Sequence, residues 1–240
     1  SSDVCSSDLI NEGALILDVG AESTRPQAQP VSEQQELDRL LPVITAIKQR
    51  FDIIISLDTS SPQVMLEGAK LGAGLINDVR ALQREGALAA AAQTKLAICL
   101  MHMQGQPATM QQQPLYDSVI DEVYAFLKQR IDACHQAGID HSRLLIDVGF
   151  GFGKTLTHNL QLLAQLSHFK QLQCPILVGM SRKSMLGTIL GGAPVNQRLF
   201  AGLSAATIAA LNGAHIIRTH DVKATIDSLA VVNAMLSIGK

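Results

Sequence analysis

The sequence predicts an α/β protein with the fold of a TIM (β/α)8 barrel, and three observations support this prediction. Seven short aliphatic runs recur along the chain, and each run stops at a polar residue. A segment of helix length follows every run. The chain has 240 residues, and one such barrel typically needs about 250. This alternation is typical of a parallel sheet whose strands are joined by helices.

The strands are predicted from runs that are hydrophobic throughout, because a parallel strand is buried on both faces. They fall near residues 14–18, 53–57, 74–77, 96–101, 144–147, 176–180 and 215–218. Apolar residues at helical spacing predict the helices, near residues 33–50, 61–72, 85–93, 117–137, 157–171, 198–212 and 222–237. The expected N-caps are Ser32, Ser60 or Ser61 before Pro62, and Thr157.

The first nine residues depart from this alternation. The segment SSDVCSSDL repeats the triplet SSD and holds no strand-length apolar run, so residues 1–9 are expected to be a non-native or disordered segment. Residues 10–240 then form a single barrel domain with seven strands. The first strand of the barrel is therefore predicted to be missing or replaced, which would leave two strand edges unpaired.

The overall composition favours a small-molecule substrate. Nineteen basic and 21 acidic residues give a net charge of −2, which offers no overall field for nucleic acid or an anionic membrane. No apolar stretch reaches the roughly 18 residues of a membrane helix, and no leader-like segment opens the chain. The four cysteines are scattered without a CxxC pair. These features predict a cytoplasmic protein without a disulfide framework.

Eight polar residues end the aliphatic runs or follow them closely. They are Asp18, Asp58, Asn77, His102, Asp147, Lys183, Arg218 and His220. In a parallel barrel such residues meet at one rim, where the chemistry takes place. The histidines show no metal-binding spacing, and the GFGFGKT segment lacks the first glycine of a P-loop, because Val148 stands there. Neither a metal site nor a nucleotide site is predicted from these motifs.

The chain resembles the bacterial dihydropteroate synthase family in seven blocks, which occur in the family's order. The blocks are DVGAESTRP at 18–26, SLDTS at 56–60, INDVR at 76–80, CLMHMQGQPATMQ at 99–111, DVGFGFGK at 147–154, GMSRKS at 179–184 and IIRTHD at 216–221. Each block is weak alone, but the ordered set is specific. The resemblance implies a transferase of folate biosynthesis. Its reaction joins (7,8-dihydropterin-6-yl)methyl diphosphate to 4-aminobenzoate through a C–N bond, giving 7,8-dihydropteroate and diphosphate.

The resemblance also implies roles for individual residues. The pterin-binding positions are Asp58, Asn77, Asp147, Lys183 and Met101. The diphosphate-binding positions are Thr24, Arg25, Arg218 and His220, and the aminobenzoate-binding positions are Arg25, Phe152 and Ser184. The implied catalytic residues are Lys183, Asp58, Arg218 and His220. They would act by positioning and electrostatic stabilisation, because the chain shows no set of residues for a covalent nucleophile. Helix capping, loop hydrogen bonding and core packing are the structural alternatives.

The family implies further partners. Mg²⁺ is the implied cofactor, but the metal-binding Asn of the family's first strand has no counterpart here, so no metal ligand is identified. The implied partners are the two small-molecule substrates and a second copy of the chain, in a homodimer formed by the last helices. Two other functions stay open. One is a module that binds a pterin without turnover, because the N-terminus is lost. The other is a pterin-dependent methyltransferase domain, against which STRP and SRKS argue.

Overall fold

The computed structural model describes residues 6–22, 31–105, 110 and 114–238. The seven expected strands form in the predicted order. They are β1 (Ile16–Val19), β2 (Ile54–Asp58), β3 (Leu75–Asp78), β4 (Ala97–Met101), β5 (Leu144–Asp147), β6 (Leu177–Val178) and β7 (Ile216–Ile217). All pairings are parallel: β1 to β5 follow one another in one sheet, and β6 pairs with β7. A bridge between Ile146 and Ile176 connects the two groups.

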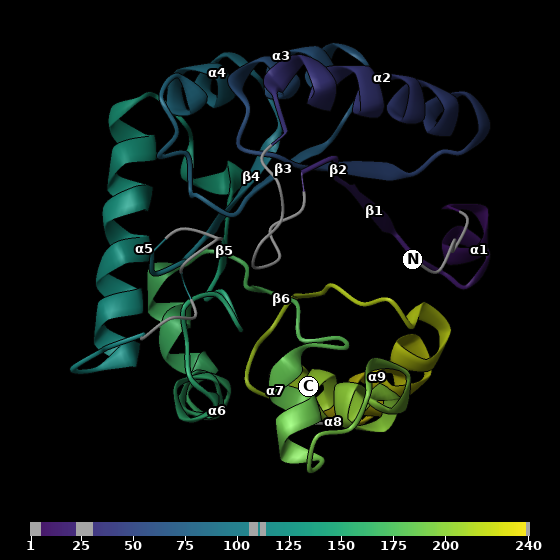
Figure 1. Cartoon of the computed structure of the whole chain (residues 1–240), viewed down its shortest axis with the longest axis vertical. Helices are drawn as coiled ribbons and strands as arrows, with labels where there is room; N and C mark the ends of the chain where they lie inside the picture. Colours follow the sequence, from purple (N-terminus) through teal and green to yellow (C-terminus); the bar gives the residue numbers. More distant parts are fainter. Residues whose placement is uncertain (1–5, 23–30, 106–109, 111–113, 239–240) are drawn as a thin grey trace.

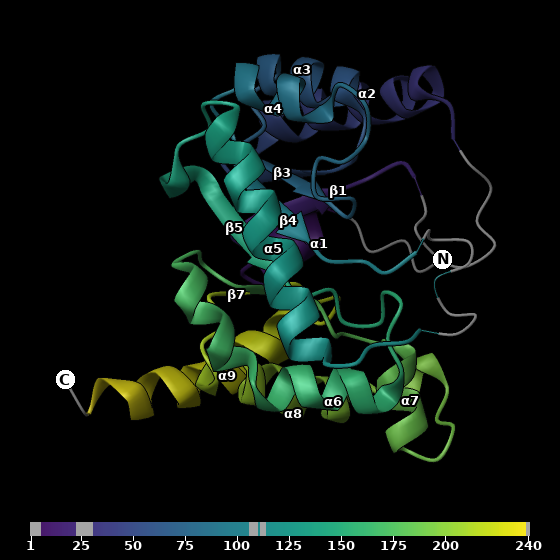
Figure 2. The same cartoon turned by 90° about the vertical axis from the view of Figure 1, so that its left-hand side faces the viewer.

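Helices surround the strands (Figure 1). The α-helices are α1 (Ser6–Asn11), α2 (Glu33–Arg50), α3 (Pro62–Lys70), α4 (Ala87–Gln93), α5 (Val119–Gln136), α6 (Leu156–Ala164), α7 (Ser184–Ile189), α8 (Leu199–Leu211) and α9 (Val222–Ser237). Three short 3-10 helices, η1 (His141–Arg143), η2 (Leu166–Leu172) and η3 (Val195–Gln197), complete the set. Figures 1 and 2 show α2, α3 and α4 together on one side of the molecule and α6 to α9 on the opposite side. Within the described ranges, no helix is both long and apolar enough to cross a membrane.

The helix boundaries largely follow the predicted signals. Ser32 caps α2 in a capping box with Gln35, and the Ser61 hydroxyl caps α3 ahead of Pro62. The expected cap at Thr157 was wrong: Thr155 caps α6 and accepts from the backbone N–H of His158. The helix expected over 157–171 is divided into α6 and η2, because the α-helical pattern ends at Ala164.

Successive side chains of a strand point into two different hydrophobic clusters, and this alternation decides which way the polar rim residues face. Ile76, Ile98 and Ile146 are fully buried in the large aliphatic core that also includes helix residues. Leu75 and Leu145 belong to a smaller cluster with residues of β4, β6 and β7. Because side chains alternate along a strand, Asn77 and Asp147 lie on the same face as this smaller cluster, one step closer to the rim.

The ring of strands is open between β1 and β7. In the described part of the chain, β1 pairs with β2 alone and β7 with β6 alone. A cavity of about 760 Å³ lies there, with both strands in its wall. Apolar residues such as Ile16 and Ile217 line most of it, and the cavity reaches Asp18, Arg218 and His220 at the rim.

The described part of the N-terminal segment is helical. Residues 1–5 lie outside the described residues, and residues 6–9 were expected to be irregular or foreign to the fold. Residues 6–9 instead begin α1, where Leu9 and Ile10 contact the aliphatic core. This contact supplies the apolar burial that the polar triplets alone do not suggest. The assignment of residues 1–9 as non-native, and of residues 10–240 as one domain, stays a prediction.

Candidate active site

The rim ends of β1, β2 and β3 and the residue after β7 form an ion-pair cluster. The guanidinium of Arg218 donates from Nε to Asp18 Oδ2 at 2.6 Å. Its Nη2 lies 3.5 Å from Asp58 Oδ2. Asn77 donates from Nδ2 to the Asp18 carboxylate at 3.2 Å. Four of the rim residues, Arg218 among them, thus form one cluster, although 200 positions separate Asp18 from Arg218.

Burial decides the charge of the rim carboxylates. It raises the pKa of Asp58 to about 7, and the nearby carboxylate of Asp18 adds to this rise, while Arg218 opposes it. Burial also raises the pKa of Asp147, which is only 7% exposed, whereas Lys183 is the largest influence that lowers it. Asp58 therefore titrates near neutral pH. Carboxyl groups shifted in this way are common at functional sites.

Lys183 follows β6 and lies near these acids, since its charge interacts with both Asp147 and Asp58. Its ammonium donates to the carbonyl oxygen of Phe150 at 2.5 Å and lies 4.8 Å from the ring centre of Phe152. Burial lowers the pKa of Lys183 to about 8, and Asp147 opposes this shift. The lysine is therefore close to both a pterin-binding candidate and an aminobenzoate-binding candidate. Ser184 follows it as the first residue of α7, with its side chain exposed.

The glycine-rich loop between β5 and α6 requires its glycines. Gly149 and Gly153 have φ angles of +71° and +64°. An added Cβ would lie 1.9 Å from the His102 carbonyl oxygen at Gly149, and 2.5 Å from the Gln104 carbonyl oxygen at Gly153. The backbone N–H of Gly149 donates to Asp147 Oδ1 at 2.7 Å. The tight loop thus holds one oxygen of the Asp147 carboxylate.

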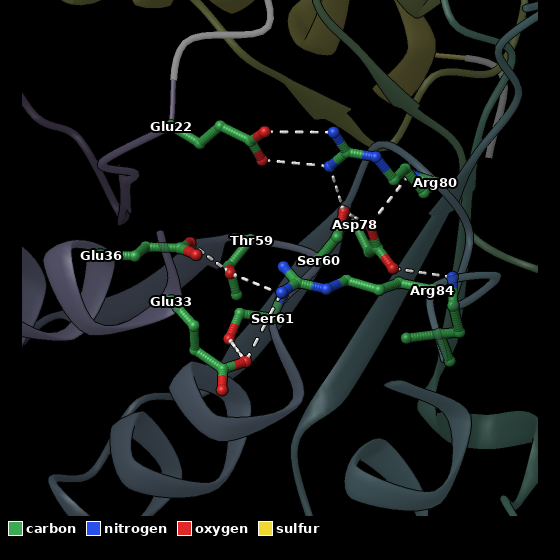
Figure 3. Close-up of polar contacts among 10 residues, drawn as sticks. Glu22, Glu33, Glu36, Thr59, Ser60, Ser61, Asp78, Arg80 and Arg84 are labelled. Atoms are coloured by element: carbon green, nitrogen blue, oxygen red, sulfur yellow. Dashed lines mark hydrogen bonds and ion pairs between the residues drawn. The ribbon is translucent and has the colours of Figure 1, made fainter. Parts of the chain in front are cut away.

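A second polar network lies beside the rim. It includes Glu22, the last described residue before segment 23–30. Figure 3 shows Arg80 and Glu22 facing each other, in a two-pronged pair with both N···O distances at 3.1 Å. Arg80 also donates to Ser60 Oγ at 2.9 Å, and Ser60 in turn donates to the buried carboxylate of Asp78. Asp78 accepts from the backbone N–H groups of Arg80 and Leu82. The loops after β1, β2 and β3 are therefore tied together.

Helix α2, which follows segment 23–30 in the sequence, contacts the same loops. Glu36 of α2 accepts from the Thr59 hydroxyl at 2.5 Å, and Glu33 accepts from the Ser61 hydroxyl at 2.6 Å. Arg84 lies 3.7 Å from Glu33 (Figure 3). Acidic residues on both sides of segment 23–30 thus contact the loops after β2 and β3.

The remaining candidates have varied positions. His220 and Arg218 line the same cavity, and Nδ1 of His220 lies 3.1 Å from Ser181 Oγ. Met101 ends β4, is 4% exposed and stands in register with Asp147. Thr24 and Arg25, expected to bind diphosphate, lie outside the described residues.

The described residues do not present a magnesium site of their own. No group of three His, Cys, Asp or Glu side chains suited to a metal gathers in the described ranges. Asp18 and Asp58 both face Arg218, and the Asn77 group near Asp18 is a donor. Mg²⁺ prefers carboxylate and water oxygens in an octahedron, so these groups do not fit the ion. No step of the reaction is assigned to it here.

The chain is similar to known pterin enzymes over most of its length. Residues 5–220 match the sequence family described as "Pterin binding enzyme". The chain is 56% identical to the dihydropteroate synthase of Escherichia coli (strain K12) over 229 residues, which are 95% of this chain and 81% of that protein. The chain belongs to the dihydropteroate synthase family. The predicted family and transferase class are thereby confirmed.

Solved structures of dihydropteroate synthases share its fold. A crystal structure of the Yersinia pestis enzyme with a sulfonamide drug is 51% identical, with a TM-score of 0.94 over 97% of this chain and 84% of that one. The Xanthomonas albilineans enzyme with 4-aminobenzoic acid is 45% identical, with a TM-score of 0.90 over 95% of this chain and 81% of that one. The predicted barrel class is confirmed, and the roles of single residues stay predictions.

Sequence reasoning missed two features of the site. In the sequence Lys154 belongs to the GFGFGKT segment, from which no site is predicted, yet its ammonium is buried among acceptors. The pairing of Glu22 with Arg80 was not predicted either. Both residues of this pair lie in family-like blocks, but pairings 58 positions apart leave no periodic signal in one sequence.

Proposed function

We propose that this chain catalyses the condensation of (7,8-dihydropterin-6-yl)methyl diphosphate with 4-aminobenzoate, which yields 7,8-dihydropteroate and diphosphate. The observation that carries the proposal is the convergence of Asp58, Asn77, Asp147, Lys183 and Arg218 at one rim, in a chain of this family. The rim offers carboxylates for a nitrogen-rich ring and cations for an anionic leaving group.

The pterin is proposed to bind through its amino-pyrimidine edge. Two adjacent N–H groups on this edge match the two oxygens of a carboxylate such as Asp147. Asn77, two strands away and on the same face of the sheet, supplies both a donor and an acceptor. Burial of both side chains, each 7% exposed, strengthens these hydrogen bonds because water competes less.

The chemical step is proposed to proceed by loss of diphosphate. The C–O bond to the pterin methylene breaks, its electron pair leaves with diphosphate, and the ring spreads the positive charge left behind. Arg218 and His220 stabilise the departing anion, and Asp58 stabilises the cationic methylene. The aniline nitrogen of 4-aminobenzoate then forms the C–N bond with its lone pair, and its proton passes to the released diphosphate. No strong base is needed, because an arylamine is neutral at pH 7.

The second substrate is proposed to bind between Phe152, Lys183 and Ser184. An aromatic ring of 4-aminobenzoate would stack beside Phe152, with its carboxylate near Ser184. The Lys183 ammonium lies 4.8 Å from the Phe152 ring centre, so it would attract the same carboxylate. The aminobenzoate bound in the X. albilineans relative supports this substrate class.

The decisive experiment measures diphosphate release from the pterin diphosphate with and without 4-aminobenzoate and Mg²⁺. Release that depends on aminobenzoate and forms dihydropteroate supports the proposal. Tight pterin binding without release would support a non-catalytic binding module instead. Transfer of a methyl group to or from a pterin would support the methyltransferase alternative.

Three further properties are proposed with this function. A homodimer is supported by large apolar side chains exposed on α8 and α9, among them Phe200 at 79% and Val231 at 72% exposure. Such a surface is typical of a protein interface. Mg²⁺ is proposed to accompany the diphosphate of the substrate. The cytoplasm is the proposed location, since folate precursors and reduced cysteines are both expected there.

A further inference from the structure

Lys154 is a buried lysine beneath the loop that joins β5 to α6. Its side chain is 3% exposed. The ammonium donates to the carbonyl oxygens of Gly149 at 2.9 Å and Phe152 at 3.0 Å, and it lies 2.9 Å from Nδ1 of His102. An ammonium carries three protons, and these acceptors take all three. A lysine is almost never buried so fully without such partners.

His102 is the partner of Lys154 on the neighbouring strand end. Burial and the lysine charge lower the pKa of His102 to about 2, so the imidazole is neutral at physiological pH. Because an ammonium can only donate, the neutral ring faces it as the Nε2–H tautomer, whose Nδ1 accepts the hydrogen bond. The His102 residue directly follows β4, and its ring packs edge-on against Phe126 at 4.9 Å. Lys154 therefore connects the end of β4 to the loop after β5.

The loop held by Lys154 carries two groups of the proposed site. Its first part donates from Gly149 N–H to Asp147, the proposed acceptor of the pterin edge. Its later part carries Phe152, beside the proposed aminobenzoate position. Tyr116 holds the same loop from outside, since its hydroxyl donates to the Gly153 carbonyl oxygen at 2.8 Å. Lys154 contacts the carbonyl oxygens of Gly149 and Phe152 in the same loop, before the Tyr116 contact at Gly153.

The charge of Lys154 also acts on Asp147. Lys183, Lys154 and Arg218 all lower the pKa of Asp147, against the burial that raises it. Burial in turn lowers the pKa of Lys154 to about 7, while Asp147 opposes and Lys183 adds to this shift. Lys154 differs from the other two cations because its protons are fully used within the protein. Its charge is thus available to Asp147 without contact with a substrate.

We infer that Lys154 is a positioning residue of the pterin site, which fixes the 149–153 backbone and favours the ionised form of Asp147. The inference rests on the proposed function, because it assigns a ligand to Asp147. It adds a residue that touches neither substrate. Loss of Lys154 should therefore weaken pterin binding and leave binding of free diphosphate, on the Arg218 side of the rim, unchanged.

The first test compares Lys154→Met with the wild-type protein in calorimetric titrations. The ligands are 6-hydroxymethylpterin, which has no diphosphate, and inorganic diphosphate. We expect pterin affinity to fall roughly tenfold, the effect of about one charge-assisted hydrogen bond, and diphosphate affinity to change less than about twofold. The control Lys70→Met removes a lysine that is 69% exposed and should change neither. Equal losses for both ligands would overturn the inference, because a general structural defect predicts them.

The second test uses pH to isolate the charge. Lys154 is charged below its pKa of about 7 and neutral above it, so the ratio of wild-type to Lys154→Met pterin affinity should fall between about pH 6 and about pH 8. Asp58 and Lys183 also titrate in this range, but both are present in every protein compared. His102 stays neutral throughout this range. Lys154→Arg keeps a cation at every pH, so its ratio to Lys154→Met should not fall. A pH-independent wild-type ratio would overturn the electrostatic role.

The contact role is tested separately with Tyr116→Phe, which removes a loop contact without removing a charge. We expect the KM for 4-aminobenzoate to rise a few-fold while the pH dependence of pterin affinity is retained. If Lys154→Met does not fold, the pH dependence of pterin affinity in wild type and in Lys154→Arg decides: an identical pH dependence in the two proteins would overturn the inference, because only the wild-type lysine loses its charge in this range. A wild-type chain that binds pterin but releases no diphosphate would refute the proposed reaction, while the binding tests of Lys154 still stand.

Discussion

Replacement of Arg218 by alanine is predicted to weaken binding of the pterin diphosphate far more than binding of a pterin without diphosphate. Arg218 is 44% exposed in its side chain and already contacts Asp18 at 2.6 Å. A hydrogen bond between an arginine and an anion contributes about 1.5–3 kcal/mol when well formed. Because solvent reaches this guanidinium, the lower end applies, and about 1.4 kcal/mol corresponds to a tenfold change in affinity. We therefore expect roughly a tenfold loss for the diphosphate ligand.

Calorimetric titrations of Arg218→Ala with both ligands measure this difference directly. The loss for 6-hydroxymethylpterin should stay below about threefold, since removal of Arg218 affects it only through Asp58 and Asp147. Arg218→Lys keeps the charge but not the two-pronged set of donors, so its affinity for the diphosphate ligand should lie between those of wild type and Arg218→Ala. Arg50→Ala, at the exposed end of α2, is the matched control. Equal losses for the two ligands in Arg218→Ala would refute a diphosphate-binding role.

Three other perturbations test the surrounding geometry. A double-mutant cycle with Glu22→Ala and Arg80→Ala, measured by urea unfolding, should give a coupling energy of about 1–2 kcal/mol; a coupling near zero would mean that the two-pronged pair contributes nothing. Gly149→Ala should lose about 3 kcal/mol or more of unfolding free energy, because its Cβ would overlap the His102 carbonyl oxygen; an unchanged Tm would contradict the loop geometry. Asp58→Asn should lower pterin affinity about tenfold at about pH 8, where the wild-type carboxyl is ionised, and little at about pH 5.5, where it is protonated; equal effects at both pH values would contradict the raised pKa.

The strands and the rim were predictable because burial leaves a direct mark on the sequence. A run such as ILVGM at 176–180 is hydrophobic throughout, since a parallel strand is covered on both sides. The polar residues that end or follow such runs must then lie at the end of the sheet. This is why Asp147, after the run at 144–146, and Lys183, after the run at 176–180, could be predicted as rim residues. The prediction of Thr157 as a cap failed by two positions, because either Thr is an acceptable cap and only the local backbone selects Thr155.

Pairings within the rim were not predictable from one sequence. The Arg218 side chain was assigned to diphosphate by resemblance, yet in the structure it contacts Asp18 and Asp58. Nothing in local periodicity distinguishes these partners from other carboxylates, because strand order and register decide which ends are neighbours. Val19, which follows Asp18, is in register with Leu57, which precedes Asp58, and Asp58 is in register with Asn77, so the three strand ends lie side by side. Only the order of the strands around the barrel, which places β7 across from β1, brings Arg218 to them.

The ion pairs of the free rim suit a reaction that separates charge. Burial and the Asp18 carboxylate raise the pKa of Asp58 to about 7, while Arg218 lowers it. In the proposed reaction, the diphosphate gains negative charge as the C–O bond breaks and attracts Arg218 more strongly. The ion pair between Arg218 and Asp58 is weakened as a result. Positive charge develops on the pterin methylene in the same step and replaces Arg218 as the partner of the Asp58 carboxylate. In this proposal the Arg218–Asp58 ion pair is replaced by two others, Arg218 with diphosphate and Asp58 with the cationic methylene. The Asp58 carboxylate therefore keeps a counter-charge throughout the reaction.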